Sequence, residues 1–436
     1  MTDHAHAHAP AVAIVDAYAS ATRLAAAFDD AGYACVRVQS SREVPAVYRS
    51  DVDLTRYTGN IVHDEDFDAT VAALAAVRPV AVIAGGEQGV EFADRLGEAL
   101  GLDNGNGTEL SYARRSKHAQ TEVVARAGLA TARQLVVTDP GQLVRWHREI
   151  GGRIVVKPVR SARNDGVSFC DTPEDSAAAY RAITGTRSVF GVPNEGVVAQ
   201  EYLTGTEYVV NTVSCRGRHR ATDVWRYTKI NVNGVADRIN GVVSLPEDDH
   251  RRDALTAYSF AVLDALQIRY GPVHLEIMLT PDGPRLVEAG ARLCGADVAR
   301  YAQLATGESQ VERTVQAYVD PEKFLADLDS PYRLRHHAAM AFLAAPVRGI
   351  LRGYPLMGLV EALESYHDRS VKVTPGARLH RTVDDSSEPL MIGLVNPDPA
   401  ALEKDFATVC YLDGYGFYDV VDAEEDEGTD TGTDTK

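Results

Sequence analysis

Two glutamates in a predicted β-hairpin are the residues of this chain whose spacing most directly suggests chemistry. Residues 273–288 alternate apolar and polar types around a Thr-Pro-Asp-Gly-Pro turn, a pattern typical of a hairpin. Centring the turn on Asp282 places Glu276 opposite Glu288, and cross-strand partners have Cβ atoms about 5 Å apart. Facing carboxylates repel unless a cation lies between them. The pattern predicts a Mg²⁺ site; two surface glutamates paired with arginines are the alternative.

The neighbours of these glutamates support the same arrangement. Successive side chains of a strand point to opposite faces, so Leu275, Ile277 and Leu279 form one apolar face while His274 and Glu276 share the other. One face therefore suits a core and the other suits chemistry. A β-bulge would shift the register by one residue.

Lys157 is a second residue whose setting suggests a ligand. Its neighbours in residues 154–159 are nearly all apolar, and a lysine in such a strand is costly unless an anion meets it. The following loop, residues 160–168, is polar and basic and could close over phosphates through backbone N–H groups and guanidinium groups. Together they indicate a nucleotide site; an edge lysine beside an ordinary surface loop is the alternative.

The stretch at residues 200–207 could hold the nucleoside. It joins two strand patterns through a turn that contains Gly205. The backbone from Glu201 to Leu203 can pair with the edge of adenine, and the carboxylate of Glu207 can accept ribose hydroxyls.

The elements that would position these residues form an α/β first part and an α+β remainder. Short apolar runs alternate with amphipathic stretches, which predicts a parallel sheet covered by helices, at residues 11–15, 21–31, 34–38, 66–76, 80–84 and 90–100. Turns at residues 16–20 and 85–89 follow two strands, where open α/β sheets bind ligands. Glu87 is therefore a candidate pocket residue; a glutamate at a helix start is the alternative.

We expect four folded parts and two ends that do not join the fold. The predicted parts are residues 1–10 as a disordered start, 11–110 as a βαβ domain, 111–200 and 201–312 as two halves of an α+β unit with the hairpin in the second half, 313–421 as a small mixed α/β domain, and 422–436 as an acidic disordered tail.

Composition excludes several classes of protein. The formal charge is −18, with 45% hydrophobic residues, so we expect no nucleic-acid partner. No apolar run approaches the roughly 18 residues that span a bilayer, and the start lacks the pattern of a secretion signal. The five cysteines form no CxxC pair and indicate neither a disulfide framework nor a zinc site. We expect a cytoplasmic protein without a membrane partner.

In sequence order, these segments resemble the ATP-grasp superfamily and, within it, the carboxylate–amine ligases related to L-amino acid ligases. The resemblance covers almost the whole chain, and its motifs are specific in order and spacing: residues 16–20, 116–118, 156–158, 165–167, 200–207, 271–276 and 287–295. It implies an ATP-grasp fold behind an N-terminal pre-ATP-grasp domain.

The resemblance also implies roles for individual residues. ATP would be bound at its phosphates by Lys117, Lys157 and the loop residues Ser161, Gly166 and Val167, at adenine by Gln200, Glu201 and Leu203, and at ribose by Glu207. One or two Mg²⁺ ions, or Mn²⁺ in their place, would be bound by Glu276 and Glu288. Arg292 would neutralise the acyl phosphate or the tetrahedral intermediate, His274 would orient the substrate or the metal carboxylate, and Glu87, Arg292 and Gly295 would contact substrate.

Two positions depart from the family pattern. Many ATP-grasp enzymes have Asn two residues after the second metal glutamate, where this chain has Gly290, so the number of metal ions is open. The phosphate loop has one glycine, Gly166, and we expect its closure to depend on Arg160 and Arg163.

The implied reaction converts a carboxylate into an acyl phosphate, which an amine displaces to give an amide. The substrates would be a small-molecule carboxylate and an amine, with an amino acid expected. Two alternatives are a biotin-carboxylase-like enzyme that uses bicarbonate and a non-catalytic ATP-binding module. A homodimer is the default assembly, since symmetric dimers are commonest.

Overall fold

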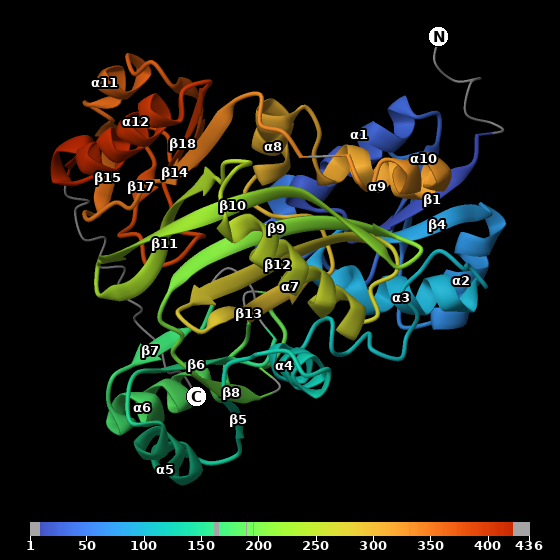
Figure 1. Cartoon of the computed structure of the whole chain (residues 1–436), viewed down its shortest axis with the longest axis horizontal. Coiled ribbons are helices and arrows are strands. Elements are labelled where there is room, and N and C mark those ends of the chain that lie inside the picture. Colours follow the sequence, from blue (N-terminus) through green and yellow to red (C-terminus); the bar gives the residue numbers. More distant parts are fainter. Residues whose placement is uncertain (1–8, 161–164, 189, 195, 331, 422–436) are drawn as a thin grey trace, which may run out of the picture. The chain divides into compact units, whose positions relative to one another are not determined.

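The computed structural model describes residues 9–160, 165–188, 190–194, 196–330 and 332–421. The chain divides into two compact units, one within residues 1–227 and 243–338 and the other within residues 228–242 and 339–436 (Figure 1). The chain enters the second unit along β10 (Arg218–Val232) and returns along β11 (Val235–Ser244). The second unit is therefore built from two separate segments of sequence.

The first unit begins with a parallel sheet in the order β3-β2-β1-β4. Its elements are β1 (Ala11–Val15), α1 (Thr22–Asp30), β2 (Ala34–Gln39), β3 (Gly59–Val62), α2 (Phe67–Ala76), β4 (Pro79–Ala84) and α3 (Val90–Ala99). In the central strand β1, Val12 and Ile14 pack with α1, whereas Ala13 and Val15 pack with α2 and α3. Helices therefore cover both faces, which confirms the predicted α/β arrangement.

Edge strand β3 has no counterpart in the predicted elements. Its side chains alternate between half-buried and exposed, and it pairs with β2 alone. Such a strand needs no apolar run, so the hydrophobic pattern does not reveal it.

A second, antiparallel sheet has the order β5-β8-β6-β7. Its elements are β5 (Gln134–Val137), α5 (Pro140–Ile150), β6 (Ile154–Pro158), β7 (Ser168–Cys170), α6 (Pro173–Ile183) and β8 (Val197–Glu201). Leu143 of α5 and Ile183 of α6 pack on Ile154 and Val156 of β6. In Figure 1 both helices lie on the outer side of this sheet, at the lower left.

The third sheet positions the predicted hairpin. Within the first unit its strands have the order β13-β12-β9-β10, with β9 (Thr206–Cys215), β12 (Gly271–Thr280) and β13 (Gly283–Gly290). Helix α7 (Arg251–Ala265) packs on one face through Leu255, Val262 and Leu263. That face is the apolar one predicted from strand alternation.

Further helices of the first unit are α4 (Lys117–Arg126), α8 (Val298–Thr306), α9 (Gln310–Val319) and α10 (Pro321–Ala326). Helix α9 contacts α1 of the N-terminal sheet and also strands β9 and β12. It therefore links the first sheet to the third.

In the second unit, the strands that follow β11 in the sheet have the order β14-β18-β16, and a small sheet has the order β17-β15-β19. The elements are β14 (His337–Phe342), β15 (Gly349–Gly353), α11 (Met357–Glu361), β16 (Tyr366–Val371), β17 (Arg378–Leu379), β18 (Leu390–Asn396), α12 (Pro399–Leu412) and β19 (Asp419–Val421).

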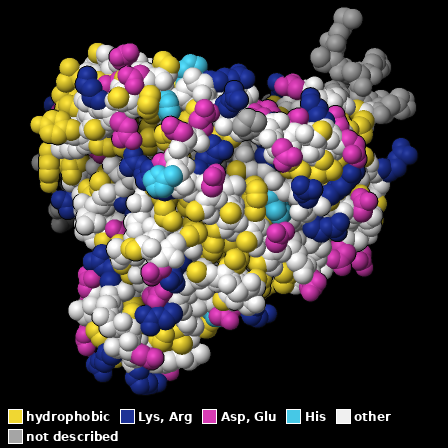
Figure 2. Space-filling view, viewed as in Figure 1, with side chains coloured by type: hydrophobic (Ala, Val, Ile, Leu, Met, Phe, Trp, Pro, Cys, Tyr) yellow, Lys and Arg dark blue, Asp and Glu magenta, His cyan; other side chains and the backbone are white. Residues whose placement is uncertain are grey.

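The surface shows mixed charge. Figure 2 shows Lys and Arg side chains interspersed with Asp and Glu over the lobe that carries α5 and α6. Across the described ranges, no helix combines the length and apolar character needed to span a bilayer.

Candidate active site

The hairpin places two carboxylates opposite each other. Glu276 and Glu288 are direct register partners across β12 and β13, as predicted. At the turn Thr280 pairs with Gly283, a register that alone would set Glu276 opposite Val287. A bulge directly after Glu276 shifts the pairing by one residue and restores the predicted partners.

Lys117 lies against the second of these glutamates. Its Nζ donates to Oε1 of Glu288 at 2.6 Å, and its side chain is only 9% exposed. The lysine begins α4, whose N-cap Ser116 accepts from the backbone N–H of Ala119. From the same helix, Gln120 bonds both the N–H and the C=O of Ala289 on β13. The glutamine therefore holds α4 on the strand so that Lys117 reaches Glu288.

Lys157 is buried at the end of β6. Its Nζ donates to Oε1 of Gln200 at 2.9 Å. Burial and the nearby charge of Lys117 lower the pKa of Lys157 to about 8, against the opposing effect of Glu288 and other carboxylates. In this structure the Gln200 side chain, which the resemblance assigned to adenine, therefore contacts the lysine that the resemblance assigned to the phosphates.

The predicted nucleoside residues lie at the end of β8 and the start of β9. Glu201 accepts from Nε of Arg133 at 2.5 Å. Leu203 is half-buried, and Glu207 is buried at 7% exposure. These three residues lie along one stretch of chain, as the motif predicted, and their roles stay predictions.

The phosphate loop is described in part. Ser161 and Arg163 lie outside the described residues, whereas Gly166 has φ +70° and a Cβ there would come within 2.9 Å of Pro158, so this position requires glycine. Val167 follows it and leads into β7. The Arg160 guanidinium lies 3.0 Å from Glu91 of α3, which ties the start of the loop to the N-terminal sheet's helix.

Arg292 forms an ion pair with the buried carboxylate of Glu87. Nε of Arg292 donates to Oε2 of Glu87 at 3.0 Å, and Nε of Arg115 lies 3.6 Å from Oε1 of the same carboxylate. Burial alone would raise the pKa of Glu87, but the two guanidinium groups and Lys117 lower it below its usual range. The pair also lies close to Gly290, where a Cβ would come within 3.2 Å of both Arg292 and Glu87.

Close backbone packing fixes the turn that carries Glu87. A Cβ on Gly85, Gly86 or Gly89 would come within 2.8 Å of the backbone of residues 15–17. These three glycines therefore let the β4 turn lie directly on the β1 turn, and Glu87 projects from between them in the short helix Glu87–Gly89.

His274 lies on the same sheet face as Glu276. Its Nε2 is 3.4 Å from Oε1 of Glu276, and the hydroxyl of Tyr227 donates to the same oxygen at 3.2 Å. Burial lowers the pKa of His274, but Cys294 and Glu276 outweigh it and raise the pKa to about 10. The pKa of Glu276 falls to about 2, because His274 and more distant cations outweigh its own burial.

Gly295, a predicted substrate residue, lies on the loop that follows β13 and Arg292. It is exposed and has no neighbour within 4 Å of a Cβ position. The next two residues, Ala296 and Asp297, have φ values of +52° and +61°, and Arg23 of α1 donates two hydrogen bonds to Asp297. The loop after Arg292 is therefore strained and tied to the N-terminal sheet.

Near the predicted site residues lie several that the sequence patterns did not single out: Arg115, Gln120, Asn211 and Asp223. Asn211 and Asp223 did leave a signal, since each is a polar residue within a run of apolar strand residues. Arg115 and Gln120 left none, because their roles depend on where α4 docks.

The donor set fits a metal ion that arrives with nucleotide. Among the residues that the structure describes, no three His, Cys, Asp or Glu side chains form a group able to hold a metal on their own. Glu276 and Glu288 form a pair. Mg²⁺ commonly takes one or two protein carboxylates and completes its shell with water and substrate phosphates.

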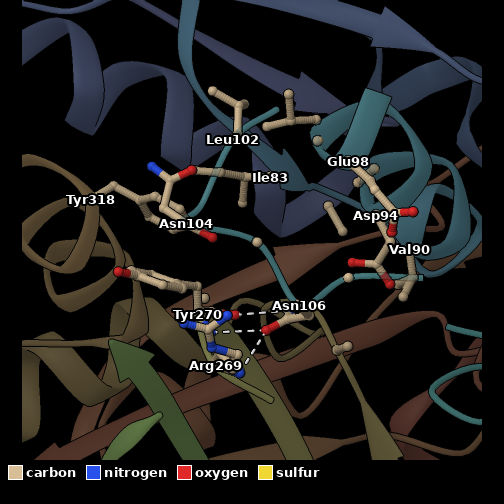
Figure 3. Close-up of a pocket in the computed structure, with 18 of the residues that line it drawn as sticks. Ile83, Val90, Asp94, Glu98, Leu102, Asn104, Asn106, Arg269, Tyr270 and Tyr318 are labelled. Carbon is tan, nitrogen blue, oxygen red and sulfur yellow. Dashed lines mark hydrogen bonds between the residues drawn. The ribbon is translucent and has the colours of Figure 1, made fainter. Parts of the chain in front are cut away.

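A cavity of about 150 Å³ lies elsewhere in the first unit, between α3, the loop at residues 102–107 and the start of β12 (Figure 3). At its floor, the side chain of Asn106 accepts from the backbone N–H groups of Arg269 and Tyr270 and donates to the carbonyl of Tyr270. None of the predicted site residues lines this cavity, so it is separate from the carboxylate pair.

Comparison with known proteins gives a consistent picture. Residues 150–299 match the family model described as an ATP-grasp domain. The chain is 32% identical over 406 residues to dapdiamide A synthase from Enterobacter agglomerans, covering 91% of this chain and 94% of that protein.

Solved structures are similar in fold. An L-amino acid ligase from Bacillus licheniformis has a TM-score of 0.75 at 18% identity, covering 95% of this chain and 99% of that chain. The ADP complex of an N5-carboxyaminoimidazole ribonucleotide synthetase has a TM-score of 0.66 at 16% identity, covering 93% and 97%.

Proposed function

The chain belongs to the ATP-grasp family, and from this premise we propose that it activates a carboxylate as an acyl phosphate and passes the acyl group to the amine of an amino acid. The relationship to dapdiamide A synthase and the fold shared with an L-amino acid ligase support an ATP-dependent ligase that forms an amide bond.

One observation carries the proposal: the facing pair Glu276 and Glu288, with Lys117 on Glu288 and the Arg292–Glu87 pair beyond Gly290. In this cluster Glu276 and Glu288 would act as metal ligands, Lys117 as a cation for phosphate and Arg292 as a cation for an oxyanion. Phosphoryl transfer requires mainly positioning and neutralisation of charge, and these groups supply both.

ATP would lie between the second and third sheets. Lys157 and Lys117 would contact its phosphates, and the loop with Gly166 and Val167 would cover them. The backbone at Glu201 and Leu203 would hold adenine, and Glu207 would hold the ribose. Gln200, bonded to Lys157, would orient that lysine as well as contacting the base.

Glu276 and Glu288 would hold Mg²⁺, which neutralises phosphate charge and aligns the γ-phosphoryl group. Lys117 would then turn from Glu288 to a phosphate oxygen. His274 and Tyr227 bond the same oxygen of Glu276 and would keep this carboxylate oriented while the substrate carboxylate approaches.

Arg292 would neutralise the carboxylate that attacks and the oxyanion that forms when the amine adds. A guanidinium fixed by a buried carboxylate is preorganised for this task, since it needs no reorientation as charge develops. Glu87, which already fixes Arg292, would also accept a hydrogen bond from the ammonium group of an amino acid, and Gly295 would border the same substrate.

We also propose a homodimer located in the cytoplasm, with the parts 11–110, 111–200, 201–312 and 313–421 as its domains. Light scattering of the purified protein tests the dimer, and a mass of one chain would contradict it.

The test of function is phosphate release from ATP and Mg²⁺ with single amino acids and with pairs of them. The proposal predicts release that depends on an amino acid, ADP as the nucleotide product and an amide in the presence of the productive pair. Glu288→Ala should abolish release, whereas Glu247→Ala, at an exposed glutamate of the same unit, should not. Release that depends on bicarbonate instead would favour a carboxylase.

A further inference from the structure

Three buried polar side chains form a row across the face of the third sheet that carries Glu276, one from each of β12, β9 and β10. Nδ1 of His274 on β12 lies 3.0 Å from Oδ1 of Asn211 on β9. Nδ2 of Asn211 donates to Oδ1 of Asp223 on β10 at 2.5 Å. The three residues are 6%, 1% and 1% exposed. We call them the His274–Asn211–Asp223 relay.

The strand register builds this relay. Asn211 is the direct partner of His274 across β12 and β9, and it is also the direct partner of Asp223 across β9 and β10. Direct partners project from the same face of a sheet. The relay is therefore a row across the sheet, next to the row that holds Glu276 and Glu288.

The Asp223 carboxylate is held by donors alone. Besides Asn211, it accepts from Oγ1 of Thr222 at 2.7 Å and from Nε1 of Trp225 at 2.5 Å. Three hydrogen bonds offset much of the cost of burying this group, although burial still raises its pKa. The charge of His274, across Asn211, acts in the opposite direction and lowers the pKa of Asp223.

These donors and acceptors fix the direction of the relay. Oδ1 of Asp223 accepts from the indole N–H of Trp225, which can only donate, so the same oxygen is also the acceptor for Asn211, which turns its NH₂ to Asp223 and its oxygen to His274. His274 must then donate from Nδ1, which turns the Nε2 edge toward Glu276 at 3.4 Å. Without Asp223 the amide of Asn211 could take either orientation.

We propose that Asn211 and Asp223 are positioning residues of the ligase, which hold the His274 ring against Glu276 and thereby fix the carboxylate that binds the metal ion. This rests on the proposed function for the identity of the metal face. Groups behind a metal ligand set its orientation, and their loss typically costs about 10- to 100-fold in metal affinity or activity.

The test compares three variants of the full chain. Asn211→Leu removes the middle of the relay, and Asp223→Asn keeps its size while removing its charge. Thr212→Val is the matched control: Thr212 is the next residue of β9, is fully buried and bonds the carbonyl of Val273 from the opposite face. Thermal melting shows whether each variant is folded.

The readout is Mn²⁺ binding in the presence of a non-hydrolysable ATP analogue, followed by electron paramagnetic resonance. We expect the Mn²⁺ dissociation constant to rise about 10- to 100-fold in Asn211→Leu and somewhat less in Asp223→Asn. Thr212→Val should leave the Mn²⁺ dissociation constant within about twofold of the parent value, even if its melting temperature falls as much as those of Asn211→Leu and Asp223→Asn. An unchanged constant in folded Asp223→Asn and Asn211→Leu would overturn the proposal.

A double-mutant cycle tests whether the relay acts through His274. If it does, adding Asn211→Leu to His274→Gln should weaken Mn²⁺ binding little further than His274→Gln alone. Effects that multiply would mean that Asn211 acts on the fold and not on the ring, and would also overturn the proposal. Failure of the parent protein to bind Mn²⁺ with nucleotide would instead count against the proposed function.

Discussion

The two faces of the third sheet differ sharply, although alternate residues of the same strands form them. On one face Leu275 and Ile277 are fully buried against α7, which lies over β12 and β13 in Figure 1. On the other, His274 and Glu276 take part in hydrogen bonds that continue through Asn211 to Asp223. Because side chains alternate along a strand, residues that stabilise the core lie directly next to residues that form the proposed site.

Among substitutions that test this difference between the faces, we expect the largest effect from one on the polar face. Glu288→Ala removes a proposed metal ligand and the 2.6 Å hydrogen bond that Lys117 donates to Glu288. We expect kcat/KM to fall on the order of 10³-fold, with little change in the urea midpoint of unfolding. Steady-state phosphate release and urea denaturation measure the two quantities, and a large loss of stability with activity retained would contradict the comparison.

The complementary change is on the apolar face. Leu275→Ala empties part of a core in which Leu275 is 0% exposed, and we expect a loss of about 2–5 kcal/mol in the free energy of unfolding. At a temperature where the variant is folded, its kcat should stay within a few-fold of the parent. A loss of kcat as large as that of Glu288→Ala would show that the faces are not independent.

We also expect the binding of ATP at the polar face to depend on pH. The pKa of Lys157 is lowered to about 8, chiefly by burial, so the free protein loses this proton as the pH rises through about 8. ATP binding must then restore it, and the dissociation constant for ATP should rise about tenfold per pH unit above 8. Lys157→Arg should flatten the rise, because a guanidinium keeps its proton; an equal slope in both proteins would contradict the assignment.

The lowered pKa of Lys157 also predicts how the stability of the protein changes with pH. An unfolded lysine keeps its proton to about pH 10.4, so between that value and pH 8 the unfolded chain binds more protons at this position. The contribution of Lys157 to stability therefore increases with pH over this window. Comparing urea midpoints of parent and Lys157→Met at pH 7 and 9.5 checks the sign.

The smallest effect is expected at the exposed edge of the region proposed to bind nucleotide. Arg133 pairs with Glu201, but its side chain is 63% exposed, and such pairs contribute roughly 0–1 kcal/mol. Arg133→Ala should therefore change the KM for ATP by less than about fivefold. A larger change would indicate that Glu201 depends on this arginine for its position.

The sequence predicted the parts of the site that follow from strand alternation. The facing glutamates and the apolar face required only the hairpin pattern, and the N-terminal sheet followed from the βαβ rhythm. The pairing of Glu276 with Glu288 is nevertheless achieved through a bulge at Val287, which the turn alone does not indicate. The prediction centred the turn on Asp282 and gave the right partners, whereas the structure reaches the same pairing through a tighter turn and a bulge.

The parts that the sequence did not reveal depend on contacts between distant segments. Lys117 reaches Glu288 because Gln120 bonds the backbone of Ala289, and no local pattern contains that docking. Likewise, Gly290 departs from the family pattern where the Glu87–Arg292 pair fills the space. The setting of Gly290 can be understood only once Glu87, about 200 residues earlier in the chain, is placed beside it.

The most direct test of the central claim is transfer of oxygen from the carboxylate substrate to phosphate. An amino acid that supports phosphate release would be labelled with ¹⁸O in its carboxylate, and the released phosphate would be analysed by mass spectrometry. An acyl phosphate predicts one ¹⁸O atom in each phosphate released during amide formation. Unlabelled phosphate accompanying the amide, or label found in AMP, would contradict the account.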